Sequence, residues 1–473
     1  MERPSSRTAL PRGTTLAALG LCACRGEPPL PADPAAVAAR PSFVLLLPDS
    51  LRADRLDATR DGAAVAPAMR ALADRGVRFD RAFSQAGWTM PALAAVMTGR
   101  YPVVPSADPS LLAWRAPESQ GLVESLAIQG YHTVGFFGPN ADALRSEYTE
   151  SFTEEAQGGT AALARWLATG PPEPFLAVVH DVDLQFVAHT GDLADIPGAA
   201  AGLAALRRPR EQDSEALSIG ELQRIVAPSL GPEAAEERLR AAYDAVVARW
   251  DHDLAAVLAA LDGSTLGART VVILTSPHGH HLGEHRRFVH GTLHEPDLHV
   301  PLIWADGSFP GHGRRVQDEV LLLDLAPTLL ARVGAPPDAG SDGRSLLGLL
   351  QLGPPGWAPR HSFALNNRRD MALRAWPDKL VRFEPGRGDP QAPPVGHLCF
   401  DLADDPGEDH PDREACPTAL LEELEAFHAA RIAQSDAVAP APDNPALVRK
   451  LREQGYWGQI APEGSQKPGE REP

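Results

Sequence analysis

The sequence has little positive charge, few cysteines and no long apolar run. Its 44 Lys and Arg are outnumbered by 62 Asp and Glu, so the formal net charge is −18. Binding to nucleic acid needs a basic surface, and this balance argues against such a partner. There is no internal period, which argues against a repeat architecture. With 44% hydrophobic and 22% charged residues among 473, the chain has the composition of an ordinary globular protein.

The N-terminus has the features of an export signal. Three arginines precede a short apolar run from Thr14 to Cys22, which is too brief to span a bilayer. The run ends in LCAC, which resembles a bacterial lipobox with Cys24 as the lipidated residue, although Cys22 is off-pattern. We expect an exported periplasmic or outer-membrane lipoprotein that contacts the membrane through its lipid anchor. Cleavage without lipid, or a disordered start, is the alternative.

Only two cysteines, Cys399 and Cys416, lie outside this leader. In an oxidising compartment such a pair is expected to form a disulfide, and closing so short a loop would stabilise the fold by about 3 kcal/mol. Two unrelated thiols are the alternative.

Apolar runs and helical patterns alternate through the body of the chain. The run SFVLLL, Ser42 to Leu47, is typical of a buried parallel strand. The same pattern predicts strands over Thr133–Phe137, Phe175–Val179 and Thr270–Thr275, and helices over Pro67–Gly76 and Glu233–Leu261. Strand, turn and helix in this order predict a doubly wound α/β sheet. Ligands bind at the carboxyl ends of such strands, where Asp49, His180 and His278 fall.

Several segments resemble the sulfatase family of the alkaline-phosphatase superfamily. They include PDSLRADRL from Pro48, WTMPAL from Trp88, TVVILTSPHGHHLGEH from Thr270 and LLLDLAPTLLARVG from Leu321. The resemblance spans roughly residues 41–457. It implies an alkaline-phosphatase/sulfatase-like, mostly parallel sheet with helices on both faces, and a small C-terminal α+β subdomain.

The domain boundaries follow from this resemblance and from composition. We expect a signal at 1–24, a Pro- and Ala-rich tether at 25–40, a sulfatase-like domain at 41–355, a C-terminal subdomain at 356–434 and a tail at 435–473 that is disordered at its end. In the subdomain we expect strands near Met371–Arg374 and Lys379–Phe383 and a helix over Pro417–Ala433.

The resemblance also implies a divalent-metal site, and this sequence departs from it. Asp49 matches the first metal carboxylate, and Ser50 stands where a second Asp or a Thr is usual. In the loop that follows Thr275, His278 is kept, but Pro277 replaces the expected Asp and supplies no side-chain ligand. A calcium ion would then lack the six to eight oxygen ligands that it prefers. A zinc site rebuilt from the histidines that crowd residues 278–294, with His280 and His281 facing the vacated position, is one alternative, and no metal is another.

Thr89 occupies the position of the residue that sulfatases convert to formylglycine, and Thr cannot form that aldehyde. A Thr at a helix start can still attack a phosphoryl group, because helix amides hold the anion. The alternative is that Thr89 is the N-cap of a helix over Pro91–Thr98. Leu93 replaces the family's Arg.

The remaining site residues are those expected to hold the anion. Gln185 stands where the resemblance implies a His and offers neither charge nor a proton near neutral pH. Arg52 is predicted to bind substrate as well, and His290 to protonate the leaving oxygen or steady the anion. If no zinc site is present, the alternative is that His285 and His290 are family-like and the other histidines of this segment are solvated loop residues.

Two functions remain open. The first is a catalytically degenerate sulfatase-like protein of the cell envelope that binds an anionic ester or glycan. This one is favoured, because Leu93, Gln185 and Pro277 carry no charge where the family carries it. The alternative is an active metal-dependent hydrolase of sulfuric or phosphoric esters with Thr89 as nucleophile.

Overall fold

We describe a computed structural model of the chain, which covers 40–103, 120–138, 152–182, 184, 186–189, 216–218, 232–287, 290–309, 313–351, 357–366, 370–384, 396–411 and 416–437. The predicted signal with Cys24, the tether up to residue 39 and the predicted tail beyond residue 437 lie outside these residues. In the described part of the chain, no helix is long and apolar enough to cross a membrane.

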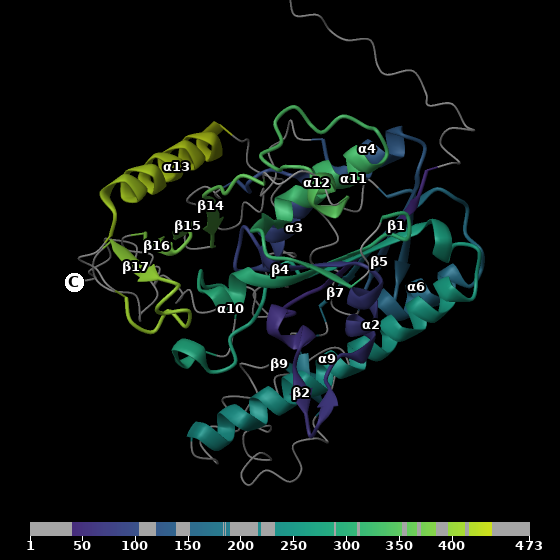
Figure 1. The fold of residues 1–473 in the computed structure, drawn as a ribbon, viewed down its shortest axis with the longest axis horizontal. Helices are drawn as coiled ribbons and strands as arrows, with labels where there is room; N and C mark the ends of the chain where they lie inside the picture. The colour runs from purple at the N-terminus through teal and green to yellow at the C-terminus, as the bar shows by residue number, and fades with distance from the viewer. Residues whose placement is uncertain are drawn as a thin grey trace, which may run out of the picture.

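A nine-stranded, mostly parallel sheet forms the centre of the molecule (Figure 1). Its path is β12-β4-β11-β10-β1-β7-β5-β6, with β13 paired to β4. β11 runs antiparallel to both β10 and β4. The strands are β1 (Ser42–Pro48), β4 (Val77–Phe83), β5 (His132–Phe137), β6 (Glu154–Gln157), β7 (Phe175–Asp181), β10 (Thr270–Thr275), β11 (His299–Ala305), β12 (Arg314–Val316) and β13 (Val320–Leu321).

Strand β1 shows why the sheet is covered on both faces. All seven of its residues are buried. Successive side chains point to opposite faces: Val44 and Leu46 enter one apolar cluster, while Phe43 and Leu45 enter another. A continuous apolar run is therefore what this position in the sheet requires.

Helices cover the two faces of the sheet (Figure 1). The first cluster is closed by α2 (Pro67–Arg75), α6 (Gly159–Leu167) and α9 (Pro232–Asp262). The second is closed by α3 (Thr89–Thr98), α4 (Leu122–Ile128), α11 (Leu325–Arg332) and α12 (Leu347–Leu350). The predicted fold class, a doubly wound sheet of the alkaline-phosphatase/sulfatase type, is confirmed.

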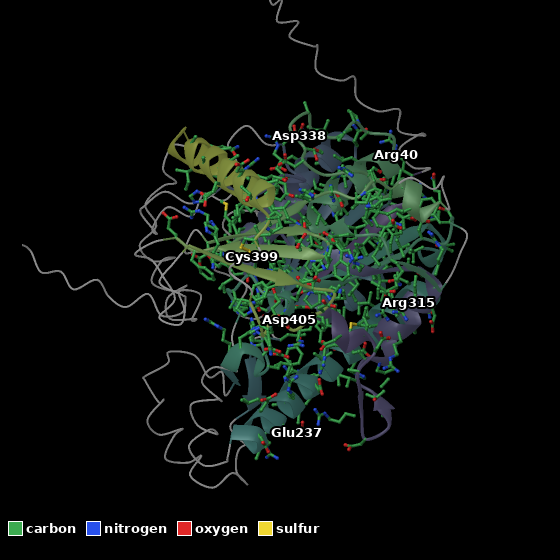
Figure 2. All side chains as sticks on the ribbon, turned by 60° about the vertical axis from the view of Figure 1, so that its left-hand side comes forward. Arg40, Glu237, Arg315, Asp338, Cys399 and Asp405 are labelled. Carbon is green, nitrogen blue, oxygen red and sulfur yellow. A yellow bond between two sulfur atoms is a disulfide. The ribbon has the colours of Figure 1, made fainter. Side chains whose placement is uncertain are left out.

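A separate antiparallel sheet follows in the chain. It consists of β14 (Ser362–Leu365), β15 (Met371–Ala375), β16 (Asp378–Arg382) and β17 (His397–Asp401), and α13 (Thr418–Ala437) packs against it. Cys399 of β17 forms a disulfide with Cys416 just before α13, with the two Cα atoms 5.5 Å apart (Figure 2). The boundaries at residues 355 and 434 stay predictions.

Shorter elements connect these layers. They are η1 (Ala53–Leu56), β2 (Thr59–Arg60), β3 (Ala63–Ala64), β8 (Phe186–His189), β9 (Ala216–Ser218), η5 (Gly267–Arg269), η6 (Glu284–Arg286), α10 (Glu295–Leu298) and η7 (Leu322–Asp324).

Candidate functional site

The ends of three central strands bring together the polar residues predicted to form the site. Asp49 follows β1, His180 lies near the end of β7 and His278 follows β10. The Asp49 amide donates to the Asp181 carbonyl at 2.7 Å, which continues the β1–β7 pairing beyond the strand. Asp49 and His278 are fully buried and His180 is 3% exposed. Parallel neighbours in one sheet therefore place these side chains together, as the sequence predicts.

A strained turn after Asp49 is held from several sides. Ser50 has a φ of 64°, a left-handed conformation that is uncommon for a residue with a Cβ. The Tyr243 hydroxyl of α9 donates to the Ser50 carbonyl at 2.6 Å and accepts the Arg52 amide at 3.1 Å. The Leu51 amide donates to Ser276 Oγ at 3.0 Å. These bonds fix the direction of the Asp49 side chain.

Thr89 reaches this cluster from the start of α3. Its hydroxyl donates to Asp49 Oδ2 at 2.8 Å and lies 3.1 Å from His278 Nε2. The possibility that Thr89 caps a helix beginning at Pro91 is wrong. The helix begins at Thr89 itself, Trp88 is the N-cap, and this N-cap has no side-chain capping bond. The Thr89 hydroxyl instead donates to the buried Asp49 carboxylate.

The buried Asp49 and His278 form an ion pair. His278 Nε2 lies 3.0 Å from Asp49 Oδ1, and His278 Nδ1 donates to the Gly279 carbonyl at 2.8 Å. Burial alone would lower the pKa of His278, but the Asp49 carboxylate outweighs it and the pKa is raised. Burial would likewise raise the pKa of Asp49, yet His278 and His180 hold it well below its usual range. The charged forms of both residues are favoured.

The family's other charged positions are apolar or lie outside the described residues. Leu93 is 3% exposed and packs in the apolar cluster between the sheet and α3, α4, α11 and α12. Pro277 is buried beside His278. Gln185 lies outside the described residues, so its predicted contact with the anion stays a prediction. Neither Leu93 nor Pro277 brings a charged side chain to the site.

Two further histidines stack on the cluster. The ring of His290 lies 4.3 Å from that of His278 and 5.8 Å from that of His280, centroid to centroid. His280 in turn stacks on Tyr243 at 6.1 Å. Burial, together with His278 and His280, keeps the pKa of His290 well below its usual range, so its neutral form is favoured. The predicted catalytic role of His290 stays a prediction.

The donors at this strand end are fewer than a divalent cation usually takes. Among the described residues, no group of three or more His, Cys, Asp or Glu side chains is arranged to hold a metal. Calcium prefers six to eight oxygens, while this strand end offers Asp49 and Ser50 Oγ. Zinc needs the lone pairs of imidazoles, but the two nitrogens of His278 face the Asp49 carboxylate and a carbonyl. The assignment of Asp49, Ser50, His278 and His280 as metal ligands stays a prediction.

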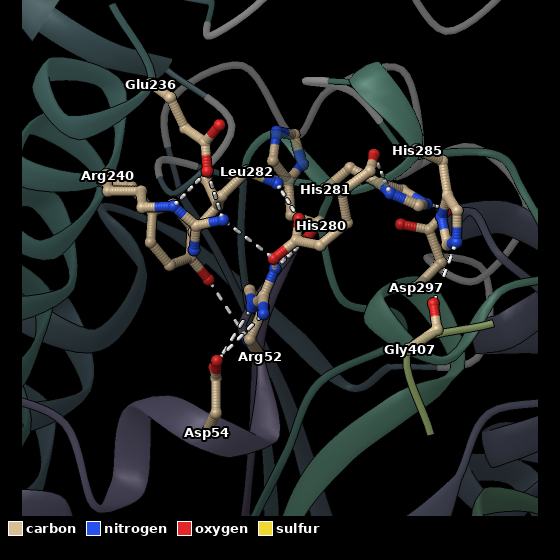
Figure 3. A network of polar contacts seen from close by, with 12 residues as sticks. Arg52, Asp54, Glu236, Arg240, His280, His281, Leu282, His285, Asp297 and Gly407 are labelled. Atoms are coloured by element: carbon tan, nitrogen blue, oxygen red, sulfur yellow. Dashed lines mark hydrogen bonds and ion pairs between the residues drawn. The ribbon is translucent and has the colours of Figure 1, made fainter. Parts of the chain in front are cut away.

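Arg52 is engaged by protein carboxylates (Figure 3). Its guanidinium pairs with Asp54 and with Glu284, each at 2.9 Å, and donates to the His280 carbonyl at 2.9 Å. Arg240 of α9 also donates to Glu284, at 3.2 Å. The Arg52 side chain is 11% exposed. Its predicted contact with an anionic substrate would therefore compete with these ion pairs.

Sequence reasoning missed Tyr243, which lies within the predicted helix Glu233–Leu261. A signal was present, because a tyrosine on the apolar face of a helix usually finds a hydrogen-bond partner for its hydroxyl. The identity of that partner, the Ser50 carbonyl, depends on packing between segments 193 residues apart.

The mostly parallel sheet with helices on both faces defines an alkaline-phosphatase-like α/β protein. A sequence model of the Sulfatase family matches residues 41–335, and the chain belongs to that family. A sulfatase of Formosa agariphila is 28% identical over 218 residues, which cover 46% of this chain and 38% of the relative. The chain thus spans about a third of the length of the curated relatives it matches.

Solved structures agree on the fold. A 2-O GAG sulfatase superposes with a TM-score of 0.63 at 18% identity, covering 86% of this chain and 96% of that one. A phosphonate monoester hydrolase of Agrobacterium radiobacter gives 0.59 at 20% identity, with 83% and 96% covered. At these identities the likeness concerns the fold alone.

Proposed function

We propose that this chain is a catalytically degenerate sulfatase that binds an anionic glycan without hydrolysing it. The observation that carries the proposal is the closed Thr89–Asp49–His278 cluster. The Thr89 hydroxyl is fully buried and hydrogen-bonded to Asp49, and the His278 imidazole lies against both residues. A nucleophile needs an open path to its substrate, whereas here the position is part of the packed interior.

Apolar substitutions around the cluster support the same conclusion. Leu93 belongs to the core and Pro277 brings no ligand. Trp88 and Met90, on either side of Thr89, pack in one apolar cluster with Leu373 of the C-terminal sheet. The cation in these surroundings, His278, is already paired with Asp49, so it would stabilise an anionic transition state little. The anionic ligand is suggested by family membership and by the 2-O GAG sulfatase among the similar structures.

Turnover measurements test the proposal. Purified chain is incubated with an aryl sulfate and an aryl phosphate in the presence of Ca²⁺, Mg²⁺, Mn²⁺ or Zn²⁺, beside Thr89→Ala as the matched variant. We expect no turnover above that of Thr89→Ala under any condition, and measurable binding of a sulfated oligosaccharide by calorimetry. Turnover in the wild type that disappears in Thr89→Ala would overturn the proposal.

That outcome would establish the second candidate, an active hydrolase with Thr89 as nucleophile. One observation favours it. Thr89 lies at the first residue of α3, where backbone amides can hold an anion, with a carboxylate 2.8 Å from its hydroxyl. The similar phosphonate monoester hydrolase shows that this fold also supports phosphoryl chemistry in another protein.

We also propose that the protein is exported and anchored through Cys24, on the strength of the LCAC motif and the short apolar run before it. Mass spectrometry of the mature N-terminus tests this location. A diacylglycerol adduct on Cys24 is expected, and a mature chain that starts elsewhere without lipid contradicts it.

A further inference from the structure

An exposed aromatic side chain lies where the two sheets meet. Trp376 follows β15 in the turn to β16, and 51% of it is exposed. The guanidinium carbon of Arg81, on β4 of the large sheet, lies 4.3 Å from the centre of its ring, and that of Arg374 lies 5.4 Å away. We call these three residues the Trp376 platform.

The charged side chains beside the indole differ in exposure, and the most exposed of them is the cation Arg81. Glu319 Oε2 accepts from Arg81 Nη2 at 3.3 Å and also from Arg374 Nη1, so one carboxylate serves two guanidinium groups. The side chain of Arg81 is 29% exposed, that of Glu319 14% and that of Arg374 7%. Burial and the neighbouring Arg374 lower the pKa of Arg81, while the carboxylates of Glu319, Glu295 and Asp318 act in the opposite direction. Solvent therefore meets an indole ring and a guanidinium, with the carboxylate behind them.

We propose that the Trp376 platform binds a sulfated saccharide, with a sugar ring on the exposed part of the indole and a sulfate on Arg81. The apolar face of a sugar ring packs well on a rigid aromatic surface. A guanidinium presents several N–H donors in one plane, which suits a sulfate oxygen pair. The proposal locates the glycan binding that the proposed function requires and therefore rests on it.

The isolation of Trp376 favours a sugar over a protein or a membrane. Among the described residues, Trp376 and Ile128 are the large apolar side chains that are mostly exposed. Ile128 ends α4, which lies across the molecule from the C-terminal sheet in Figure 1. Protein and membrane partners need a contiguous apolar area. A single ring beside one cation matches the size of one sulfated sugar.

Calorimetry with the full chain tests this surface. The probe is a fully sulfated heparin-derived tetrasaccharide, and the desulfated tetrasaccharide is its control. We expect Trp376→Ala and Arg81→Gln each to weaken binding by about tenfold or more, and Trp376→Phe to retain most of the affinity. Arg315→Gln is the matched control, since Arg315 is an exposed arginine on the neighbouring β12. Thermal melting verifies that each variant is folded.

The outcomes separate this inference from the proposed function. Wild-type binding that persists unchanged in folded Trp376→Ala overturns the platform and leaves glycan binding in place. Equal affinity for the desulfated probe, or an Arg315→Gln effect as large as that of Arg81→Gln, also overturns it. If the wild type binds neither probe, glycan binding itself is wrong. Hydrolysis of the sulfated probe would overturn the proposed function alone.

Discussion

The Thr89 hydroxyl donates to Asp49 Oδ2 at 2.8 Å, across 40 positions of sequence. Asp49 ends the central strand β1, and Thr89 begins helix α3 on one face of the sheet. The bond joins the residue predicted from the family resemblance to be a metal carboxylate to the residue predicted to be the nucleophile. Both residues are fully buried, so the bond contributes to the stability of the core.

Removing the Thr89 hydroxyl should therefore destabilise the protein. Thr89→Val keeps the shape but leaves the buried Asp49 carboxylate without this donor, which should cost about 1–3 kcal/mol of unfolding free energy. Urea denaturation measures the change. Thr98→Val on the same helix is the control, because the Thr98 hydroxyl donates to the Ala94 carbonyl and not to a carboxylate. A Thr89→Val cost no larger than that of Thr98→Val would contradict the role given to this bond.

Replacing Pro277 by Asp should restore a metal ligand beside His278. Pro277→Asp adds a carboxylate after β10, next to the end of β1 that carries Asp49, and two carboxylates attract a hard cation better than one. Calorimetry with Ca²⁺ should detect binding in this variant and weaker or no binding in the wild type. Pro277→Ala removes the ring without supplying a ligand and should behave as the wild type does. If Pro277→Asp and Pro277→Ala bind Ca²⁺ equally, the loop does not align with the family's metal loop.

The central strands could be predicted because each is a continuous apolar run, and β10 matches its predicted range Thr270–Thr275. Strand β4 was not predicted, since its sequence VRFDRAF mixes charged and apolar residues and the strand is only partly buried. The hydrogen-bond and ion-pair partners of individual side chains were harder to predict than the strands. Arg52 pairs with Glu284, which is 232 residues away, and that choice depends on how α9 and the 280–284 loop pack. For Thr89 the local sequence left a capping role open beside the predicted nucleophile, because its partner Asp49 is 40 positions away in the chain.

Stability should fall as the pH drops from 7 towards 6, because four histidines have a lowered pKa and one, His278, has a raised pKa that acts in the opposite direction; the four are His281, His285, His290 and His299. Burial lowers the pKa of His281 and of His299, so in this range the unfolded chain binds more protons than the folded one. The stability from these neutral rings is present above the unfolded value of 6.5 and is lost below it, by up to about 1.4 kcal/mol per pH unit for each ring.

Asp297 acts in the opposite direction at lower pH. Burial raises its pKa from 3.8 to about 6, so its contribution is lost as the pH rises through about 6. The loss of stability caused by the histidines should therefore be clearest above pH 6. Urea denaturation at closely spaced pH values measures the slope, and His299→Gln should reduce it. A slope that is flat or reversed between pH 7 and 6 would show that these histidines are not buried as neutral rings.

A buried lysine joins the C-terminal sheet to the loop that follows it and to α10. Lys379 Nζ of β16 lies 2.6 Å from Glu408 Oε1 and 3.0 Å from Glu295 Oε1, and Lys379 is fully buried. Burial would lower the pKa of Lys379, but the two carboxylates raise it, so the charged form is favoured. Lys379→Met would leave both carboxylates without this cation, at a cost of about 3–5 kcal/mol.

Urea denaturation of Lys379→Met beside Arg382→Met tests this expectation. Arg382 lies on the same strand and pairs with Glu425 and Glu384, whose side chains are 46% and 23% exposed, so its loss should cost less than the loss of Lys379. Adding Glu408→Gln to Lys379→Met should recover part of the loss, because it removes one uncompensated buried charge. Equal costs for the two single variants, or no recovery in the double variant, would mean that the Lys379 pair does not hold the C-terminal sheet in place.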